Sequence, residues 1–358
     1  MPRAPARSDV PADRPRDLPL ADVVRLQQAA CDRAGSVVYA RILEAVAADV
    51  EADGPCADLL EPWAANALAD AVPLRLLGAV HRIVLAGRAP ELAAYYPSAG
   101  GVDEGDPVPA FRAVVAWHFD ELEDGMRHGV QTNEVGRACA LFGGFHHVAR
   151  STGLPLRLLE VGASAGLLLR WDHYGYIVGG RNLGGDAALR FHEPWSGAVP
   201  AVADDLRVAE RIGCDVNPVD PSSVEGARTL RGFLWPDQRH RRARLDAALE
   251  IAARVPATVE QADAADWVDD RLAAPAPRMA TVIYHSIVLQ YLPRETFRRM
   301  RETLDEAGHR ATHDAPLFWL RMEPAGEVAD IGLRSWPGGN DRVLGTTDYH
   351  GPPVAWTS

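Results

Sequence analysis

The chain has few cysteines, no long apolar segment and too few basic side chains to balance its acidic ones. The cysteines are Cys31, Cys56, Cys139 and Cys214. They lie far apart without a C-x-x-C pair, which excludes a disulfide framework or a cysteine zinc site and favours a reducing cytoplasm. No apolar run reaches the ~18 residues that cross a bilayer, so we expect no membrane insertion. The formal net charge of -12 argues against a nucleic-acid partner, because phosphate binding needs concentrated Lys and Arg.

The N-terminal segment carries arginine and proline but lacks the apolar core of a secretory signal. We therefore expect residues 1–20 to form a disordered leader, with a targeting role as the alternative. The 358 residues predict about two domains. A hydrophobic fraction of 47% and a charged fraction of 24% are typical of a globular protein. These features predict a cytoplasmic protein that acts on small molecules.

The pattern of apolar residues changes near residue 155. Residues 21–152 have helical apolar spacing and predict a helical N-terminal cap domain. Residues 153–358 alternate predicted strands and helices, with a hairpin insertion at about 174–195, two helix-forming stretches at about 222–253 and 294–307, and three strands at the end. This order predicts an α/β fold: a Rossmann-like, mostly parallel sheet with an antiparallel C-terminal β-meander.

The segment LRLLEVGASAGLLL (156–169) fits two chemistries. As G-x-S-x-G it predicts an α/β-hydrolase with Ser164 as the nucleophile. That fold needs strands and an oxyanion segment upstream, and the upstream residues here are helical. Glu160 would also be an unpaired carboxylate at the buried end of the strand, which is costly. The hydrolase is therefore a lesser alternative.

The same segment also resembles a cofactor loop that follows the first strand of a nucleotide-binding sheet. Glu160 ends the strand, while Gly162 and Gly166 allow a tight turn and a close backbone approach to a ligand. Ala163 and Ser164 lie between the glycines. Because ligands of open α/β sheets bind at the carboxyl ends of the strands, all five residues are predicted to bind the cofactor.

Acidic residues follow the next two predicted strands. IGCDVNP ends in Asp215, the predicted ribose ligand, with Asn217 or Asp220 as alternatives. EQADAADW supplies Asp263 and Asp266 as the acids beside the base, with Asp263 followed by Ala264. A glycine loop followed by two such acids is a more specific pattern than the loop alone.

The fourth predicted strand, in VIYHSIVLQYLP, ends with polar side chains. His285 is the first candidate for a base or for positioning the acceptor substrate; a structural histidine bonded to nearby backbone is the alternative. Gln290 and Tyr291 are candidates for holding substrate, or for capping the helix that begins at Pro293.

QTNEVGR, just before the first strand, is placed to reach the cofactor. Arg137 is predicted to pair with a carboxylate, and Asn133 and Glu134 to bind an ammonium group or the substrate. The alternative is a helix capped by Thr132 or Asn133, with an Arg–Glu pair on its surface.

Several of these motifs resemble class I S-adenosylmethionine-dependent methyltransferases: DVNP after a strand, ADAADWV and HSIVLQYLP. QTNEVGR, LLEVGASAGL, WPDQ, HSIVLQYLP and LRMEP…WPGG together are similar to an uncharacterised bacterial family, domain of unknown function 2332, over about residues 25–356. The resemblance implies a methyltransferase-like core, without a known reaction. By position, Glu160, Gly162 and Gly166 match the glycine motif, Asp215 the ribose acid and Asp263 the adenine acid.

The chain departs from the methyltransferase pattern at two places. Ser164 replaces the middle glycine, and Asp215 lies 49 residues beyond Gly166, against ~20 in the dinucleotide fingerprint. The hairpin at about 174–195 accounts for the extra length.

These observations predict an enzyme that binds S-adenosylmethionine and methylates a small molecule. A non-catalytic sensor or scaffold that binds S-adenosylmethionine or S-adenosylhomocysteine is the alternative, and an NAD-dependent oxidoreductase is weaker still. No metal is expected, because the adjacent His146 and His147 would face different directions on a helix. The sequence indicates no oligomeric state.

Overall fold

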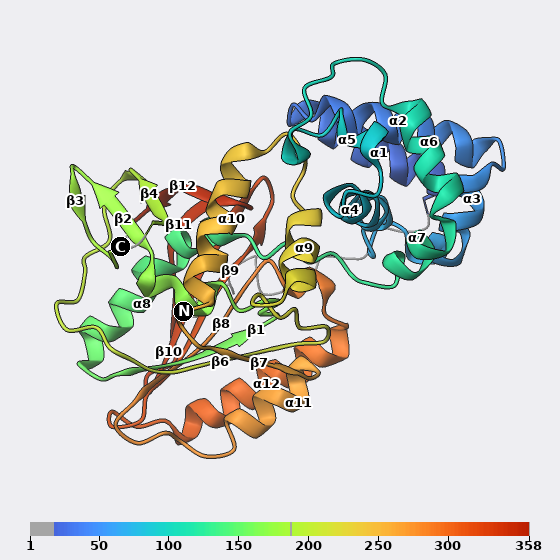
Figure 1. Ribbon diagram of the computed structural model, residues 1–358. Helices are drawn as coiled ribbons and strands as arrows, with labels where there is room; N and C mark the ends of the chain where they lie inside the picture. The colour runs from blue at the N-terminus through green and yellow to red at the C-terminus, as the bar shows by residue number, and fades with distance from the viewer. Residues whose placement is uncertain (1–17, 187, 358) are drawn as a thin grey trace. The chain divides into compact units, whose positions relative to one another are not determined.

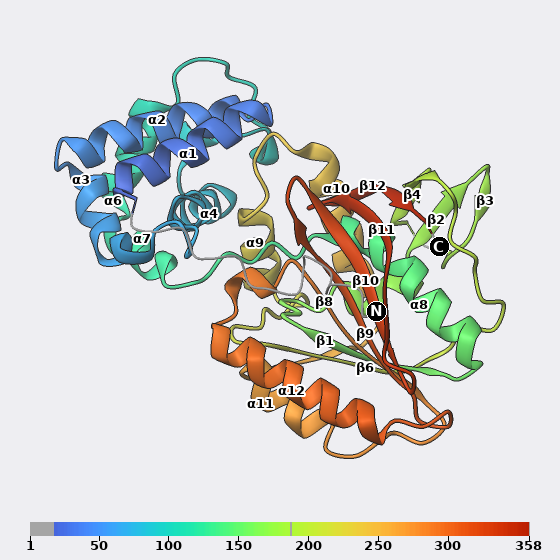
Figure 2. The same cartoon turned by 180° about the vertical axis from the view of Figure 1, so that it is seen from behind.

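The computed structural model describes residues 18–357 except residue 187, and these fall into two compact units (Figures 1 and 2). The helical unit consists of residues 18–132 and Val219–Asp246, and the sheet unit of Asn133–Pro218 and residues 247–357. This division differs from the predicted boundary at 152/153. The helix that precedes the first strand of the sheet belongs to the sheet unit, and Val219–Asp246 belongs to the helical unit. Most of the predicted leader lies outside the described residues.

The helical unit packs around a core of aliphatic side chains. Its elements are α1 (Leu20–Arg33), α2 (Val37–Glu51), α3 (Pro55–Leu60), η2 (Glu61–Asn66), α4 (Val72–Leu85), α5 (Pro90–Ala93), η3 (Pro97–Ala99), α6 (Val108–Trp117), α7 (Phe119–Met126), α9 (Val224–Gly232) and the first part of α10 (Arg239–Ala252). In α4, Leu76, Val80 and Ile83 recur at helical spacing and are all buried. This stripe holds the helix in place, since amphipathic helices depend mainly on packing.

The sheet unit contains a nine-stranded sheet among its described residues, in the order β5-β12-β11-β10-β9-β8-β1-β6-β7. The strands are β1 (Leu156–Val161), β5 (Trp195–Gly197), β6 (Val208–Asp215), β7 (Thr258–Gln261), β8 (Ala280–Ser286), β9 (Leu317–Ala325), β10 (Val328–Trp336), β11 (Asn340–Asp348) and β12 (Gly351–Trp356). β7, β6, β1, β8 and β9 are mutually parallel, and β9 to β12 form an antiparallel run. The expected α/β class with a mostly parallel sheet is confirmed.

The direction in which the chain crosses the sheet changes beside β1. From β1 it proceeds to β6 and β7 on one side, then returns to β8 and β9 on the other. Connections leave neighbouring strands in opposite directions at such a switch point, and this opens a crevice at the carboxyl ends. β1 and β8 are almost wholly buried apolar runs, as expected of central parallel strands. The fold thus singles out the carboxyl ends of β1 and β8.

Helices cover both faces of the sheet. α8 (Ala138–Thr152) packs on one face, and α11 (Ala264–Arg271) and α12 (Arg294–Arg310) lie on the other (Figures 1 and 2). On α12, Phe297, Met300 and Leu304 form one buried stripe. Gly144 of α8 has no room for a side chain, because a Cβ there would lie 2.4 Å from a methyl group of Leu320.

Several details differ from the predicted elements. The last predicted strand divides at the turn after Asp348, so the tail contains four strands instead of three. The stretch at 222–253 is two helices, α9 and α10. The predicted hairpin is present as β2 (Gly175–Val178) and β3 (Arg181–Asn182), and β4 (Arg190–His192) adds to it in parallel. No strand precedes residue 155 in the part of the chain that is described, as expected.

No helix within the described residues is long and apolar enough to cross a membrane.

Candidate functional site at the carboxyl ends of β1 and β8

The loop after β1 bends sharply at three residues. Gly162, Ser164 and Gly166 have φ angles of 67°, 54° and 66°. A left-handed backbone costs a serine about 1–2 kcal/mol, whereas glycine adopts it freely. A Cβ at Gly162 would lie 2.6 Å from a methyl group of Val288, so the loops after β1 and β8 touch here. The predicted tight turn is present, and the close backbone approach to a ligand stays a prediction.

The backbone amides of this loop are bonded within the protein. Ala163 N–H donates to the Cys214 carbonyl at 2.9 Å, and Gly166 N–H to the Ala163 carbonyl at 2.7 Å. Ser164 N–H donates to Oδ2 of Asp215 at 2.8 Å. These amides are therefore not turned outward as a phosphate cradle.

Asn133 clamps the glycine loop from the segment before α8. Its Nδ2 donates to the Ala163 carbonyl at 3.3 Å, and its Oδ1 accepts from Leu167 N–H at 3.0 Å. The predicted cap by Thr132 or Asn133 is wrong. Glu134 caps the short helix η4 (Val135–Arg137) instead, by accepting from Gly136 N–H at 3.0 Å.

Arg137 and Glu134 join η4 to the loops around it. The Arg137 guanidinium donates to the Ser286 carbonyl at 2.9 Å and to the Tyr349 carbonyl at 3.0 Å. Glu134 is buried, and its carboxylate lies 3.7 Å from Nδ1 of His350. QTNEVGR thus lies beside the glycine loop, with Arg137 bonded to backbone carbonyls of two other loops.

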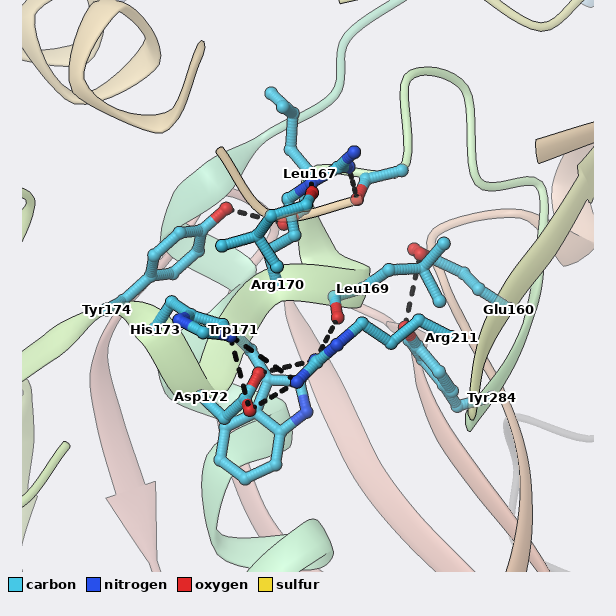
Figure 3. Close-up of polar contacts among 12 residues, drawn as sticks. Glu160, Leu167, Leu169, Arg170, Trp171, Asp172, His173, Tyr174, Arg211 and Tyr284 are labelled. Carbon is cyan, nitrogen blue, oxygen red and sulfur yellow. Dashed lines mark hydrogen bonds and ion pairs between the residues drawn. The ribbon is translucent and has the colours of Figure 1, made fainter. Parts of the chain in front are cut away.

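Glu160 is a buried acid at the end of β1, with 2% of its surface exposed. The Tyr284 hydroxyl donates to its Oε2 at 3.2 Å (Figure 3). Burial raises the pKa of Glu160 well above its ordinary value, and the nearby charges of Arg170 and Arg137 only partly oppose that rise. The acid predicted at this strand end is therefore held in surroundings that disfavour its charge.

Arg170 was not predicted from the sequence, yet it is buried against the glycine loop. Its Nη1 donates to the Gly166 carbonyl at 2.7 Å, and its Nε to the Val255 carbonyl at 2.7 Å. Arg170 lies in η5 (Leu168–His173), where an arginine so close to the glycine loop is the only sequence signal for this contact. Arg170 thus fixes the end of the glycine loop, which Asn133 bonds at both Ala163 and Leu167.

An ion pair with β6 stabilises η5. Arg211 of β6 makes two bonds of 2.6 Å to the carboxylate of Asp172 and one of 2.8 Å to the Leu169 carbonyl (Figure 3). The Tyr174 hydroxyl donates to the Leu167 carbonyl at 2.5 Å. The segment after the glycine loop is thus bonded on several sides.

Asp215 stands beside the loop, where a ribose ligand was predicted. It is half-buried, and its Oδ1 accepts from Asn217 N–H at 2.9 Å. Asn217 is exposed two residues further on. Asp220 belongs to the helical unit, and its carboxylate accepts from the Ser222 amide and hydroxyl before α9. Asp215 contacts the glycine loop directly, through the hydrogen bond from Ser164 N–H.

Asp263 forms the N-cap of α11. Its Oδ1 accepts from Ala265 N–H at 2.9 Å, and its Oδ2 accepts from the Thr296 hydroxyl at 3.4 Å. Asp263 is exposed, and Ala264 behind it is buried. Capping therefore accounts for part of the hydrogen-bonding capacity of this carboxylate.

His285 is fully buried, with both ring nitrogens bonded. Trp319 Nε1–H donates to its Nε2 at 2.9 Å, which assigns the ring proton to Nδ1. Nδ1–H then donates to Glu323 Oε1 at 2.6 Å. Without an exposed or unbonded nitrogen in this arrangement, His285 cannot take a proton from a substrate. The structure corresponds to the structural alternative, with side-chain partners in place of backbone.

Gln290 and Tyr291 lie in the short helix η6 (Leu289–Tyr291) beyond β8. Both are exposed, and Tyr291 exposes 53% of its surface. α12 has Pro293 at its N-cap without a side-chain capping bond, so the capping alternative for these two residues is wrong. No cluster of three or more potential metal ligands occurs among the described residues.

The sequence matches one family model, described as an uncharacterized protein conserved in bacteria (DUF2332), over residues 21–356. No curated protein and no solved structure matches the chain. The matched region includes every site residue described above.

Proposed function

The chain belongs to this bacterial family, DUF2332, and from that premise we propose that it binds S-adenosylmethionine and transfers the methyl group to a small molecule. The family description names no activity, so the proposal rests on geometry. The observation that carries it is the hydrogen bond from Ser164 N–H to the Asp215 carboxylate. It joins the glycine loop of β1 to the acid ending the adjacent strand, which is the arrangement expected around an adenosine ribose.

The strand order supports this proposal. Five parallel strands run in the order β7-β6-β1-β8-β9, with the switch point between β1 and β8. These strands follow the Rossmann order 3-2-1-4-5 and span both halves of such a sheet, in which ligands bind in the crevice at the switch point, where the glycine loop lies. We therefore assign a methyltransferase-like core to the sheet unit, Asn133–Pro218 and residues 247–357.

The charges at this edge favour a cationic adenosyl ligand over a dinucleotide. Asp215 ends β6 and Asp263 follows β7, the neighbouring strand, while the amides of the glycine loop that would face a pyrophosphate are bonded internally. A sulfonium is positively charged, whereas a pyrophosphate would meet like charge. The NAD-dependent alternative is weaker for this reason.

The residues present fit the groups of S-adenosylmethionine. Asp215 accepts one backbone N–H on each carboxylate oxygen, and a carboxylate has about four acceptor sites, so capacity remains for ribose hydroxyls. Asp263 and Ala264 are assigned to the adenine end. Glu160 is assigned to the ammonium end, together with the segment containing Asn133 and Arg137.

Catalysis by this chain would consist mainly of positioning. A bound sulfonium supplies an electrophilic methyl group, so aligning the acceptor accounts for much of the rate. His285 supports the loop after β8 and is not assigned as a base. Gln290 and Tyr291 are assigned to the acceptor because they are exposed on that loop, and Glu134 remains a further substrate contact.

One observation favours the non-catalytic alternative. The residue predicted to be the base is buried and doubly bonded. A sensor or scaffold needs cofactor binding alone, so it fits that arrangement. Incubation with radiolabelled S-adenosylmethionine and bacterial small-molecule extract separates the two: label transfer supports the enzyme, and tight binding without transfer supports the sensor.

The hydrolase alternative has one feature in its favour, the left-handed backbone of Ser164 on a strand-to-helix turn. The described residues before β1 contain no strand, whereas a hydrolase elbow follows several. A fluorophosphonate probe that labels the chain, but not its Ser164→Ala variant, would support this alternative.

Calorimetric titration tests the cofactor. We expect S-adenosylmethionine and S-adenosylhomocysteine to bind, and NAD to bind far more weakly. Absence of heat with both adenosyl ligands, in a sample shown to be folded by circular dichroism, would contradict the enzyme and sensor proposals together.

The four free, buried cysteines support placing this activity in a reducing cytoplasm.

A further inference from the structure

The turn after β8 contains a residue in an unfavourable backbone conformation. Ile287 has a φ of 55° and is buried. Branched side chains strongly disfavour the left-handed region, which is adopted only where the surroundings impose it. Strained residues of this kind concentrate at ligand-binding sites, so the contacts that impose this conformation bear on the candidate site.

Two kinds of contact hold the turn. Ile287 N–H donates to the Met322 carbonyl at 2.8 Å, which ties the residue to β9. Beyond it, Val288 N–H donates to Glu323 Oε1 at 3.0 Å and Leu289 N–H donates to Oε2 at 3.3 Å. The Glu323 carboxylate thus binds the two amides that the left-handed residue directs toward it.

Glu323 is itself fixed on its other side. It exposes 1% of its surface, and its Oε1 accepts Nδ1–H of His285 at 2.6 Å. Trp319 donates to the opposite nitrogen of that ring. A carboxylate with three N–H donors is well compensated for its burial, and its orientation is set by rigid strands.

The turn forms part of the wall of the candidate cofactor site. Val288 lies against Gly162, where a Cβ would come within 2.6 Å of its side chain. Gln290 and Tyr291 follow directly and are exposed. A shift of Val288 would therefore disturb the glycine loop and the residues assigned to the acceptor together.

We propose that Glu323 is a positioning residue, which holds the left-handed turn at Ile287 and thereby presses Val288 against the glycine loop at Gly162. This inference rests on the proposed function, because the wall so formed is that of the S-adenosylmethionine site. Glu323 acts through the loop and does not itself contact the ligand.

Two matched variants test the role. Glu323→Gln keeps the size of the side chain but replaces one acceptor oxygen with an NH₂ donor, so it cannot accept from both loop amides. Trp319→Phe removes the hydrogen bond that His285 accepts on its nitrogen opposite Glu323. The bonds from the Val288 and Leu289 amides to Glu323 remain. Affinity for S-adenosylhomocysteine is measured by calorimetry, and exchange of the amides at 287–289 by hydrogen-exchange mass spectrometry.

We expect Glu323→Gln to weaken binding by about 10- to 100-fold, as is usual when the support of a binding group is lost, and to accelerate exchange in the turn. Trp319→Phe should change neither. Equal effects of the two variants, or unchanged affinity in Glu323→Gln, would overturn the inference while leaving the proposed function intact. If the unaltered chain binds neither adenosyl ligand, both fall. Should Glu323→Gln not fold, Glu323→Asp provides the same test, since it keeps the charge but withdraws it from the loop.

Discussion

At the scale of single residues, Asp215 has the most specific position in the proposed site. Its carboxylate accepts hydrogen bonds from Ser164 N–H in the glycine loop and from Asn217 N–H just beyond β6. A carboxylate held in this way presents its remaining acceptor sites in fixed directions. Geometry therefore distinguishes it from Asp220, whose carboxylate is used in a local turn before α9.

Replacing Asp215 with asparagine should weaken S-adenosylhomocysteine binding by at least about tenfold, because the amide cannot accept from two backbone N–H groups and two hydroxyls. Calorimetry measures this change. Asp220→Asn is the matched control and should bind like the unaltered chain. Normal binding by Asp215→Asn with weak binding by Asp220→Asn would move the ribose role to Asp220.

Glu160 makes a prediction about stability and pH. Burial raises the pKa of Glu160 in the folded state above its pKa in the unfolded state. Once pH exceeds the unfolded-state pKa, the folded protein therefore binds more protons than the unfolded chain. Its contribution to stability is fully present below the unfolded pKa and is lost as pH rises toward the folded pKa.

Glu160→Gln cannot ionise and should escape that loss. Relative to the unaltered chain, its unfolding free energy should increase between pH 5 and pH 8, because only the unaltered chain loses stability as Glu160 ionises in the unfolded state. Urea unfolding at both pH values measures the difference. A difference that stays constant with pH would contradict the assignment. If Glu160 also holds the ligand ammonium, the same variant should bind the ligand more weakly despite its greater stability.

At the scale of elements, α8 packs closely on the sheet because it carries glycine where the two meet. Gly144→Ala improves intrinsic helix propensity by about 1 kcal/mol, but its Cβ would come within 2.4 Å of Leu320. Overpacking of this kind costs about 1–3 kcal/mol, so we expect a net loss of stability in urea unfolding. Ser151→Ala on the exposed side of α8 is the control and should not destabilise. A stabilised Gly144→Ala would contradict the packing described here.

The elements predicted well from sequence are those with a strong local pattern. β1 is a short, mostly apolar segment followed by glycines, and the sequence predicted its position correctly together with its loop. The sequence predicted one final strand because apolar residues such as Leu344 and Val354 occur on both sides of the turn at Gly351. The division there depends on the left-handed backbone of that glycine, whose φ is 104°.

The residues of the candidate site also differ in how well the sequence predicted their positions. Asp215 and Gly162 lie where the sequence predicted them, because residues at the carboxyl ends of parallel strands share one edge. The partners of His285 could not be predicted, since Glu323 and Trp319 come from a strand more than 30 residues away. Neither the polar array that fixes the turn after β8 nor the burial of Arg170 has a local pattern. Both depend on long-range pairing of strands.

At the scale of the whole molecule, the net charge of -12 should influence which adenosyl ligand binds. S-adenosylmethionine carries a methyl group and a sulfonium charge that S-adenosylhomocysteine lacks, while the two share every other group. Asp215 and Asp263 at the edge of the sheet, together with the net negative charge, should therefore favour the methyl donor electrostatically. Salt distinguishes the effect of the charge from that of the methyl group, because screening acts on charge alone.

Salt should reduce that advantage. The Debye length falls from about 10 Å at 0.1 M ionic strength to about 3 Å at 1 M, which screens the sulfonium from all but the nearest carboxylates. We expect binding of S-adenosylmethionine to weaken severalfold over this range and binding of S-adenosylhomocysteine to change less, both measured by calorimetry in sodium chloride. Asp266→Asn, which alters a charge on the exposed face of α11, should leave the difference nearly as it was, whereas Asp215→Asn should shrink it at low salt. If salt affects the two ligands equally, the selection of the donor depends on shape and hydrogen bonding, and the acids serve to hold the loops.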